Sequence, residues 1–228
     1  MSARDFRSHD EESAYEAIMD AIVTQELAPN QKVSEHIFSD MFSISRSTAR
    51  TLIERLISKQ FLVSNSPRVT VVTPLRALEV RQNFTLRKIL LPPLWTKAAS
   101  KVDHKKLCKL HQEIKQLHPI DSDDTALQLL KKNKEFNMNI CEKTGFPVAV
   151  EWASQLEDTA MRIYWLYIKL NRQSPYLPEH QGMLIEQLRA YDPARIQSAV
   201  HDIITQAEDN VLDSLFSSQQ FNSHELRN

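Results

Sequence analysis

The first third of the chain carries short helical repeats of hydrophobic residues, separated by polar breaks. Apolar residues recur every three to four positions from Ser13 onward, and again after Ser34 and Ser45, three residues that suit the N-cap position of a helix. The last of these helices is expected to end near Lys59. The apolar positions of the three predicted helices are Tyr15, Ile18, Met19, Ile22 and Val23, then Ile37, Phe38, Met41 and Phe42, then Ala49, Leu52, Ile53, Leu56 and Ile57.

Two β-like runs follow the third predicted helix. They are Phe61-Leu62-Val63 and Val69-Thr70-Val71-Val72, and the stretch Ser64-Asn65-Ser66-Pro67-Arg68 between them is polar and forms turns readily. Three helices, the last two joined by a tight turn and followed by a two-stranded ribbon, have the order of a winged helix-turn-helix module. We therefore predict that module for this part of the chain.

Helical patterns continue from there to the end of the chain. Thr73-Pro74 reads as an N-cap followed by proline at the first helical position. The predicted helices lie near 75–101, 103–117, 123–143, 147–171, 179–190 and 193–216. Pro92-Pro93 is expected to kink or split the first of them, because proline lacks the N–H that a helix interior needs.

These patterns predict a mainly α protein of two domains. A flexible polar arm is expected over residues 1–12, the winged helix-turn-helix domain with its three helices and two-stranded wing over 13–73, and a polar tail over 218–228. Residues 74–217 are expected to form a six-helix antiparallel bundle.

Composition excludes several classes of protein. The chain has only two glycines, Gly145 and Gly182, so it has no glycine-rich phosphate loop. Its two cysteines, Cys108 and Cys141, form no CxxC pair and are expected to be reduced thiols. No run of about 18 apolar residues or signal-peptide pattern occurs, so we expect a cytoplasmic protein with no membrane partner.

The charge of the chain is unevenly distributed, although its formal net value is only −1. Residues 1–45 hold three cations against nine acids, whereas residues 46–72 hold five cations against Glu54 alone. The five cations are Arg46, Arg50, Arg55, Lys59 and Arg68. Positive charge thus concentrates on the third helix and the wing, the elements that meet DNA phosphates in such modules.

The start of the third helix offers several groups that suit DNA contact. Arg46 and Arg50 are four residues apart and share one helix face, while Ser47 and Thr48 carry short hydrogen-bonding groups. An ordinary solvated surface explains any single arginine equally well, so the prediction rests on the whole arrangement. The predicted DNA-binding residues are Ser34, Ser45, Arg46, Ser47, Thr48, Arg50 and Arg68.

The pattern over residues 14–73 resembles the winged-helix domain of the GntR family of bacterial transcription regulators. The resemblance is carried by Leu27-Ala28-Pro29, by Val33-Ser34-Glu35 and by Phe42-Ser43-Ile44-Ser45-Arg46-Ser47-Thr48-Ala49-Arg50. Departures from the family pattern are Asn30 and Ser43 for glycines, Thr48 for a proline and Thr51 for a glutamate. Asn30 is still expected to make its turn, because asparagine tolerates a positive φ.

Residues 75–216 resemble the effector-binding domain of the FCD branch of that family. In this branch an aspartate and three histidines usually hold a divalent metal, which helps to bind small carboxylates. Here Asn133 and Asn137 replace the first two ligands, Ile203 stands at the last position, and only His180 is retained. Arg87 matches the arginine of the branch's R-x-x-L-E pattern, in which Leu91 replaces the glutamate. We expect no metal cofactor, because zinc sites need three or four protein ligands.

A pocket that binds an organic effector directly is the expected substitute. The resemblance places Arg87, Asn133, Asn137 and His180 around it, and Arg87 and His180 are expected to pair with an anionic group. The alternative is that both asparagines are exposed and that His180 is an ordinary core histidine.

The predicted function is that of a ligand-responsive transcription regulator. It is expected to bind a pseudo-palindromic operator in double-stranded DNA as a homodimer. No G-x-S-x-G, H-E-x-x-H or P-loop motif occurs, so no catalytic residue and no enzyme activity are expected. The alternative is a winged-helix scaffold that contacts only proteins, which salt-dependent binding to duplex DNA would distinguish.

Overall fold

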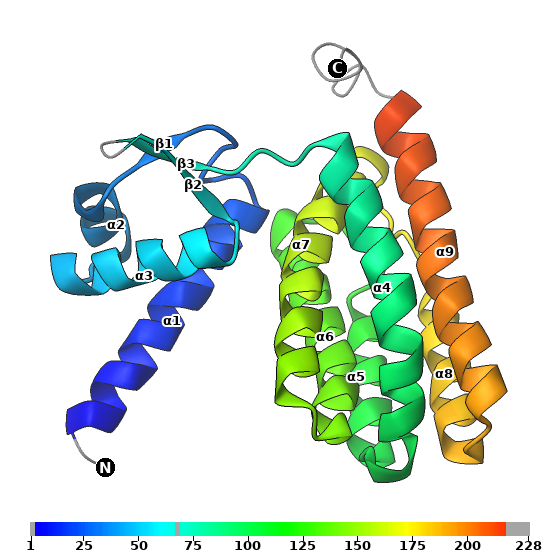
Figure 1. The fold of residues 1–228 in the computed structure, drawn as a ribbon. Helices are drawn as coiled ribbons and strands as arrows, with labels where there is room; N and C mark the ends of the chain where they lie inside the picture. Colours follow the sequence, from blue (N-terminus) through cyan, green and yellow to red (C-terminus); the bar gives the residue numbers. More distant parts are fainter. Residues whose placement is uncertain (1–2, 67–68, 218–228) are drawn as a thin grey trace. The chain divides into compact units, whose positions relative to one another are not determined.

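The computed structural model describes residues 3–66 and 69–217. The chain divides into two compact units, one that ends at Leu75 and one that begins at Arg76. The mainly α fold predicted from the sequence is confirmed (Figure 1). None of the helices within the described ranges has the length and hydrophobicity that crossing a membrane requires.

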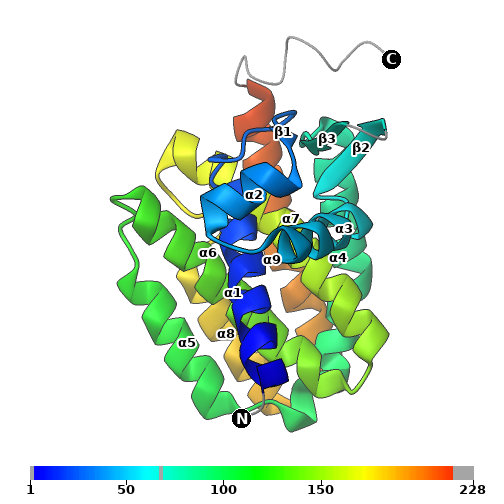
Figure 2. The ribbon, with the colours of Figure 1, turned by 90° about the vertical axis from the view of Figure 1, so that its left-hand side faces the viewer.

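The N-terminal unit has the predicted order of three helices and a wing. Its helices and strands are α1 (Ala3–Val23), β1 (Lys32–Val33), α2 (Glu35–Phe42), α3 (Arg46–Ser58), β2 (Leu62–Ser66) and β3 (Val69–Val72). The strands pair antiparallel in the order β1-β3-β2 and lie on one side of α2 and α3 in both views (Figures 1 and 2). The sheet therefore has three strands and not the predicted two, because a strand of two residues is too short for an alternating pattern to reveal.

Hydrophobic residues of all three helices meet in one core. Ile18 and Ile22 of α1, Phe38 of α2, and Leu52 and Leu56 of α3 are almost completely buried. These residues occupy the helical positions predicted to be apolar, so burial of one face from each helix holds this unit together.

Two turns of this unit use a left-handed backbone where the family pattern has glycine. Asn30 has φ 64° before β1, and Ser43 has φ 53° between α2 and α3. The expected role of Asn30 is confirmed. At Ser43 the chain is held by a hydrogen bond from the Ser39 hydroxyl to the Ile44 carbonyl oxygen (2.6 Å), which fixes the tight turn between the two helices.

Residues 3–12, predicted as part of a flexible arm, belong to α1, so this helix begins ten residues before its predicted start at Ser13. The segment contains no glycine or proline between Ala3 and Val23, so nothing in it interrupts a helix. The Glu12 carboxylate also binds the Arg55 guanidinium of α3, with Nη1–Oε2 and Nη2–Oε1 distances of 2.7 and 3.1 Å.

The C-terminal unit is built from six α-helices and two short 3-10 turns in the described residues. They are α4 (Ala77–Ala98), η1 (Ala99–Lys101), α5 (His104–Gln116), α6 (Asp123–Cys141), η2 (Glu142–Thr144), α7 (Pro147–Asn171), α8 (Pro178–Ala190) and α9 (Pro193–Ser217). Helix α4 packs on α7 and α9, α6 packs on α5 and α7, and α8 packs on α5 and α9.

Helix α4 differs from its prediction at two places. It begins at Ala77, so Thr73-Pro74 precedes the helix instead of capping it, and the Glu79 carboxylate accepts a hydrogen bond from the Arg76 N–H (3.1 Å). It also runs through Pro92 and Pro93 without splitting. The two prolines lack the N–H groups that would bind the carbonyls of Lys88 and Ile89, so α4 continues without two of its internal hydrogen bonds.

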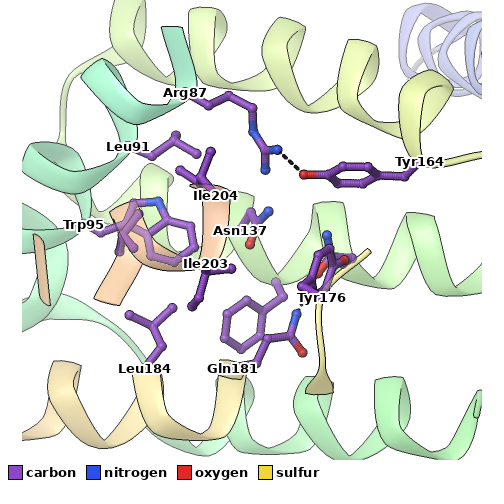
Figure 3. A pocket seen from close by; sticks show the side chains of 13 residues that line it. Arg87, Leu91, Trp95, Asn137, Tyr164, Tyr176, Gln181, Leu184, Ile203 and Ile204 are labelled. Carbon is purple, nitrogen blue, oxygen red and sulfur yellow. Dashed lines mark hydrogen bonds between the residues drawn. The ribbon is translucent and has the colours of Figure 1, made fainter. Parts of the chain in front are cut away.

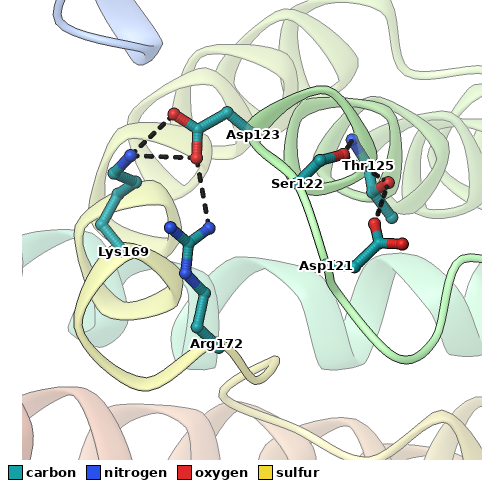
Figure 4. A network of polar contacts seen from close by, with 6 residues as sticks. All are labelled: Asp121, Ser122, Asp123, Thr125, Lys169 and Arg172. Carbon is teal, nitrogen blue, oxygen red and sulfur yellow. Dashed lines mark hydrogen bonds and ion pairs between the residues drawn. The ribbon is translucent and has the colours of Figure 1, made fainter.

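One charged residue connects the start of α6 to the end of α7 (Figure 4). The Asp123 carboxylate accepts from Lys169 Nζ at 2.6 and 2.9 Å and from Arg172 Nη1 at 3.2 Å. The hydrogen bond with Lys169, followed by that with Arg172, lowers the pKa of Asp123 against the opposing effect of its slight burial. Ser122 next to it caps α6, because its hydroxyl accepts from the Thr125 N–H (3.1 Å).

Candidate functional site

The first turn of α3 presents a cluster of hydroxyl groups. The Ser45 hydroxyl caps the helix by accepting from the Thr48 N–H (3.1 Å), and it lies 2.8 Å from the Ser47 hydroxyl and 2.9 Å from the Thr48 hydroxyl. Ser45 and Ser47 are exposed. The helix therefore begins with a capped N-terminus that a DNA phosphate can approach.

Arg50, one turn further along α3, forms a two-pronged ion pair with Glu35 of α2. The Nε–Oε1 and Nη2–Oε2 distances are 2.6 and 3.2 Å. The hydrogen bond between them lowers the pKa of Glu35 and raises that of Arg50. In the absence of DNA, the Glu35 carboxylate balances the positive charge of Arg50, although both side chains are accessible to solvent.

Arg46 differs from the other arginines of α3. Arg55 stacks 3.6 Å above the ring centroid of Tyr15 and pairs with Glu12, so it joins α3 to α1. Arg46 is exposed and makes no ion pair within residues 3–66 and 69–217. Arg46 is therefore the arginine of α3 whose charge is available to a ligand.

A surface groove of about 420 Å³ lies beside Arg46. Its lining includes Ser34, which like Arg46 is a predicted DNA-binding residue. The Ser34 hydroxyl caps α2 by accepting a hydrogen bond from the Ile37 N–H (3.2 Å). It also includes Glu35, His36 and Thr70, none of which is predicted as a site residue. Arg68, predicted in the wing, lies outside the described residues.

A second candidate site is a small cavity inside the helical unit. It measures about 30 Å³, and its lining includes Arg87 of α4 and both Asn133 and Asn137 of α6 (Figure 3). These three side chains are only 3 to 6% exposed, which rules out the alternative that the asparagines are surface residues. The cavity has room for about two water molecules.

An ion pair neutralises the arginine of the cavity. Arg87 Nη2 donates to Glu157 Oε1 of α7 (2.9 Å), and Arg87 Nη1 donates to the Tyr164 hydroxyl (2.5 Å). Asn137 Nδ2 donates to the other carboxylate oxygen of Glu157 (2.9 Å). Burial of Arg87 opposes its charge, but the nearby Glu157 and Tyr164 hold its pKa above the usual range, so the guanidinium is charged. Burial raises the pKa of Tyr164 and keeps the phenol neutral.

The structure does not bring His180 to this cavity. Its neighbour Gln181 points inward, is 4% exposed, and donates from Nε2 to Asn133 Oδ1 (2.6 Å). His180 instead lines an open groove of about 400 Å³ on α8 and α9, together with Arg195 and Asp202. Neighbouring side chains of a helix point about 100° apart, so a predicted position that is one residue off names a side chain on a different face of the helix.

Glu157 is the site residue that the sequence interpretation missed. It lies four residues after Ala153 and four before Met161, within the buried stripe of α7. An acidic residue in such a stripe signals a buried ion pair, because an unpaired buried carboxylate is very costly. Tyr164 also lines the cavity, and so do Tyr176 and Gln181. The last two escape prediction, since aromatic and amide residues resemble ordinary core.

The donor set around this cavity does not suit a divalent metal. Glu157 supplies a single carboxylate, which Arg87 and Asn137 already occupy, and the Arg87 guanidinium repels a cation. No group of three or more histidine, cysteine, aspartate or glutamate side chains able to hold a metal occurs in the described parts of the chain. The absence of a bound metal stays a prediction.

Comparisons with known proteins give a family and a fold. The model of the FCD domain matches residues 82–206. Among solved structures, E. coli McbR/YncC is similar with a TM-score of 0.75 and 16% identity, covering 90% of this chain and 97% of that chain. A putative transcriptional regulator GntR from Rhodococcus sp. RHA1 has a TM-score of 0.72 and 14% identity, covering 91% of this chain and 99% of that one.

A third solved structure is a GntR family member from Pseudomonas syringae pv. tomato str. DC3000. Its TM-score is 0.51 and its identity 17%, with 92% of this chain and 88% of that chain covered. At these identities the likenesses concern the fold alone. The comparison with curated protein sequences gave no match.

Proposed function

Because the chain belongs to the FCD-domain branch of the GntR family of transcription regulators, we propose that it is a ligand-responsive regulator that binds a pseudo-palindromic operator as a homodimer. The family consists of regulators and not of enzymes. The observation that carries the DNA-binding part is the first turn of α3, where Arg46, which forms no ion pair with any described residue, lies beside a capped helix N-terminus.

The two exposed arginines of α3 have different roles in this proposal. Arg46 meets the DNA without first giving up a partner, whereas Arg50 has to leave Glu35 before it can bind a phosphate. Ser45, Ser47 and Thr48 add short polar contacts at the same end of the helix. Arg68, predicted from the sequence to lie in the wing, is proposed as a further DNA contact.

A homodimer fits such an operator, because a two-fold protein places two recognition helices on two half-sites. The helical unit supports this part of the proposal with large apolar side chains that a second copy can cover. Leu86 and Ile89 of α4 are 40 and 65% exposed, and Val148 and Trp152 of α7 are 60 and 59% exposed. We expect a mass in solution near twice 26.4 kDa. A monomer that binds the operator with full affinity would contradict the dimer.

Effector control is proposed to act through the cavity that Arg87, Asn133 and Asn137 line. At about 30 Å³ it is too small for an organic molecule, so binding has to move the surrounding helices apart. A ligand changes the DNA affinity of the protein only if it binds one conformation of the protein better than another. A rearrangement of the helices supplies that second conformation. His180 is not proposed as an anchor in this cavity.

The DNA-binding proposal is tested by selection from random duplex DNA. The purified full-length protein is incubated with a random-sequence pool, and bound duplexes are recovered and amplified over several rounds. We expect a two-fold symmetric sequence to be enriched and to bind in a salt-dependent way. Failure to enrich any duplex would reject the proposal and leave a scaffold that contacts only proteins. Arg46→Ala is the test variant, and Lys105→Ala, an exposed lysine of α5, is the matched control.

A further inference from the structure

The charge balance of the buried cavity is the starting point. Arg87 and Glu157 are 3 and 2% exposed, and their contact of 2.9 Å leaves the pair with no net charge. Arg87 is the one charged residue among the described residues that line the cavity. The cavity therefore offers no uncompensated positive charge to an anion, contrary to the expectation that Arg87 pairs with an anionic effector.

Two residues that line the cavity each carry a buried polar atom without a partner. Within the described part of the chain, neither the donor Arg87 Nε nor the acceptor Gln181 Oε1 forms a hydrogen bond. Both side chains are more than nine-tenths buried and both line the cavity. Buried polar groups are normally satisfied, so this donor and acceptor indicate where a polar ligand group fits.

The rest of the lining is largely apolar and aromatic. Phe136 contributes a ring, as do Trp95 and Tyr176, and aliphatic side chains of α8 and α9 line the cavity as well. Figure 3 shows Trp95 and Tyr176 together with Leu184 and Ile203. One of these, Ile203 of α9, also lines the outer groove of about 400 Å³ that contains His180. Ile203 thus lines both the small cavity and the outer groove.

We propose that the cavity is the inner end of a ligand site that selects an uncharged molecule, apolar in body and carrying one hydrogen-bond acceptor and one donor. Glu157 is the specificity-determining residue, because it cancels the charge of Arg87. The molecule reaches the cavity from the outer groove by displacing Ile203. This inference rests on the proposed effector function of the helical unit.

The expected selectivity follows from the cost of burying charge. An uncharged amide can accept from Arg87 Nε and donate to Gln181 Oε1 while the ion pair with Glu157 stays intact. A carboxylate of the same shape brings a negative charge close to Glu157 and loses its hydration without a free cation in return. Its affinity is therefore lower although its size is the same.

The test uses benzamide and benzoate, two probes of nearly equal shape that differ in charge. Their affinities for Ile203→Ala are measured by isothermal titration calorimetry without DNA, and Ile203→Val serves as the milder variant. We expect benzamide to bind at least about tenfold more tightly than benzoate. Equal affinities, tighter binding of benzoate, or no binding of either probe would overturn the proposal.

Ile204→Ala is the matched control for the shared wall. Ile204 lines the cavity but not the outer groove, so its truncation enlarges the cavity and leaves Ile203 in place between the two. We expect benzamide to bind this variant at least about tenfold more slowly than Ile203→Ala. Equal association rates would overturn the role given to Ile203.

Glu157→Gln tests the origin of the selectivity. It leaves the Arg87 charge unbalanced, so the preference is expected to reverse: benzoate raises the melting temperature of this variant and benzamide does not. Persistence of the preference for benzamide would overturn the role of Glu157. Should the variant not fold even with benzoate present, the comparison in Ile203→Ala decides. These measurements involve no DNA, so their failure is distinct from failure of operator selection.

Discussion

Two arginine–glutamate pairs in this protein differ in their contacts and lie in opposite surroundings: Arg50 holds both oxygens of Glu35, whereas Arg87 holds one oxygen of Glu157. Arg50 and Glu35 lie at the surface of the winged-helix unit, with side chains 66 and 36% exposed, whereas Arg87 and Glu157 are 4 and 2% exposed inside the helical unit. A phosphate can replace Glu35, because water can solvate the carboxylate that is released. No such exchange is possible for the buried pair, so it fixes the structure and the charge of its cavity.

The largest expected effect is on stability, at the buried pair. Arg87→Met leaves the Glu157 carboxylate buried without its cation and is expected to cost about 3–5 kcal/mol of unfolding free energy. Urea denaturation measures it. The double variant Arg87→Met/Glu157→Leu is expected to recover most of the loss, and Arg81→Met, at an exposed arginine of the same helix, is the control. A loss no larger than that of the control would contradict the role given to the pair.

The next effect concerns DNA affinity. Arg46→Ala is expected to weaken binding to the selected operator by roughly tenfold or more. Each protomer of the dimer then loses a cation that can bind a phosphate without first leaving an acidic partner. Arg50→Ala is expected to cost less, since Glu35 already balances its charge. Fluorescence anisotropy at one fixed salt concentration measures both. A larger loss for Arg50→Ala than for Arg46→Ala would reverse the proposed order.

Glu35→Gln is expected to act in the opposite direction. It removes the partner that holds Arg50 and also a negative charge beside Arg46, so operator affinity is expected to rise about threefold. The same anisotropy titration measures the change, with Glu54→Gln as a matched removal of charge from an exposed residue of α3. An unchanged or reduced affinity would indicate that Glu35 positions Arg50 for DNA instead of competing with it.

The smallest effect is expected at the surface pair of Asp123 and Lys169. The pKa of Asp123 is lowered in the folded state, so its contribution to stability is present above about pH 4 and is lost as the pH falls through the lowered pKa. In Asp123→Asn, the unfolding free energy is expected to fall less steeply as the pH is lowered, because this titrating group is gone. Unfolding free energies from pH 5 to 3 measure it, with Asp124→Asn as the control. Equal pH profiles for both variants would contradict the assignment.

The sequence predicted the helices well, because most of them bury one continuous apolar stripe. The helix ends were harder to place where the local signal was only one or two residues long. Thr73-Pro74 suits an N-cap followed by the first helical position, yet α4 begins at Ala77. Strand β1 escaped prediction because its two residues are held by pairing with β3, a contact between residues far apart in sequence.

The candidate sites were predicted less completely, since their chemistry depends on contacts between elements. Arg87, Asn133 and Asn137 do line one cavity, but the partner that neutralises Arg87 lies 70 residues later in the chain. The pairing of Arg50 with Glu35 likewise depends on how α2 and α3 pack. Residue type and spacing locate such side chains on a helix face and do not reveal which charges meet.

The salt dependence of operator binding tests the central claim, that the first turn of α3 meets the DNA backbone. The logarithm of the binding constant is measured against the logarithm of the salt concentration for the wild type, Arg46→Ala and the control Lys105→Ala. The account predicts a linear decrease for the wild type and a slope smaller by about one for each half-site contact that Arg46→Ala removes, with no change in the control. Identical slopes for the wild type and Arg46→Ala would contradict it.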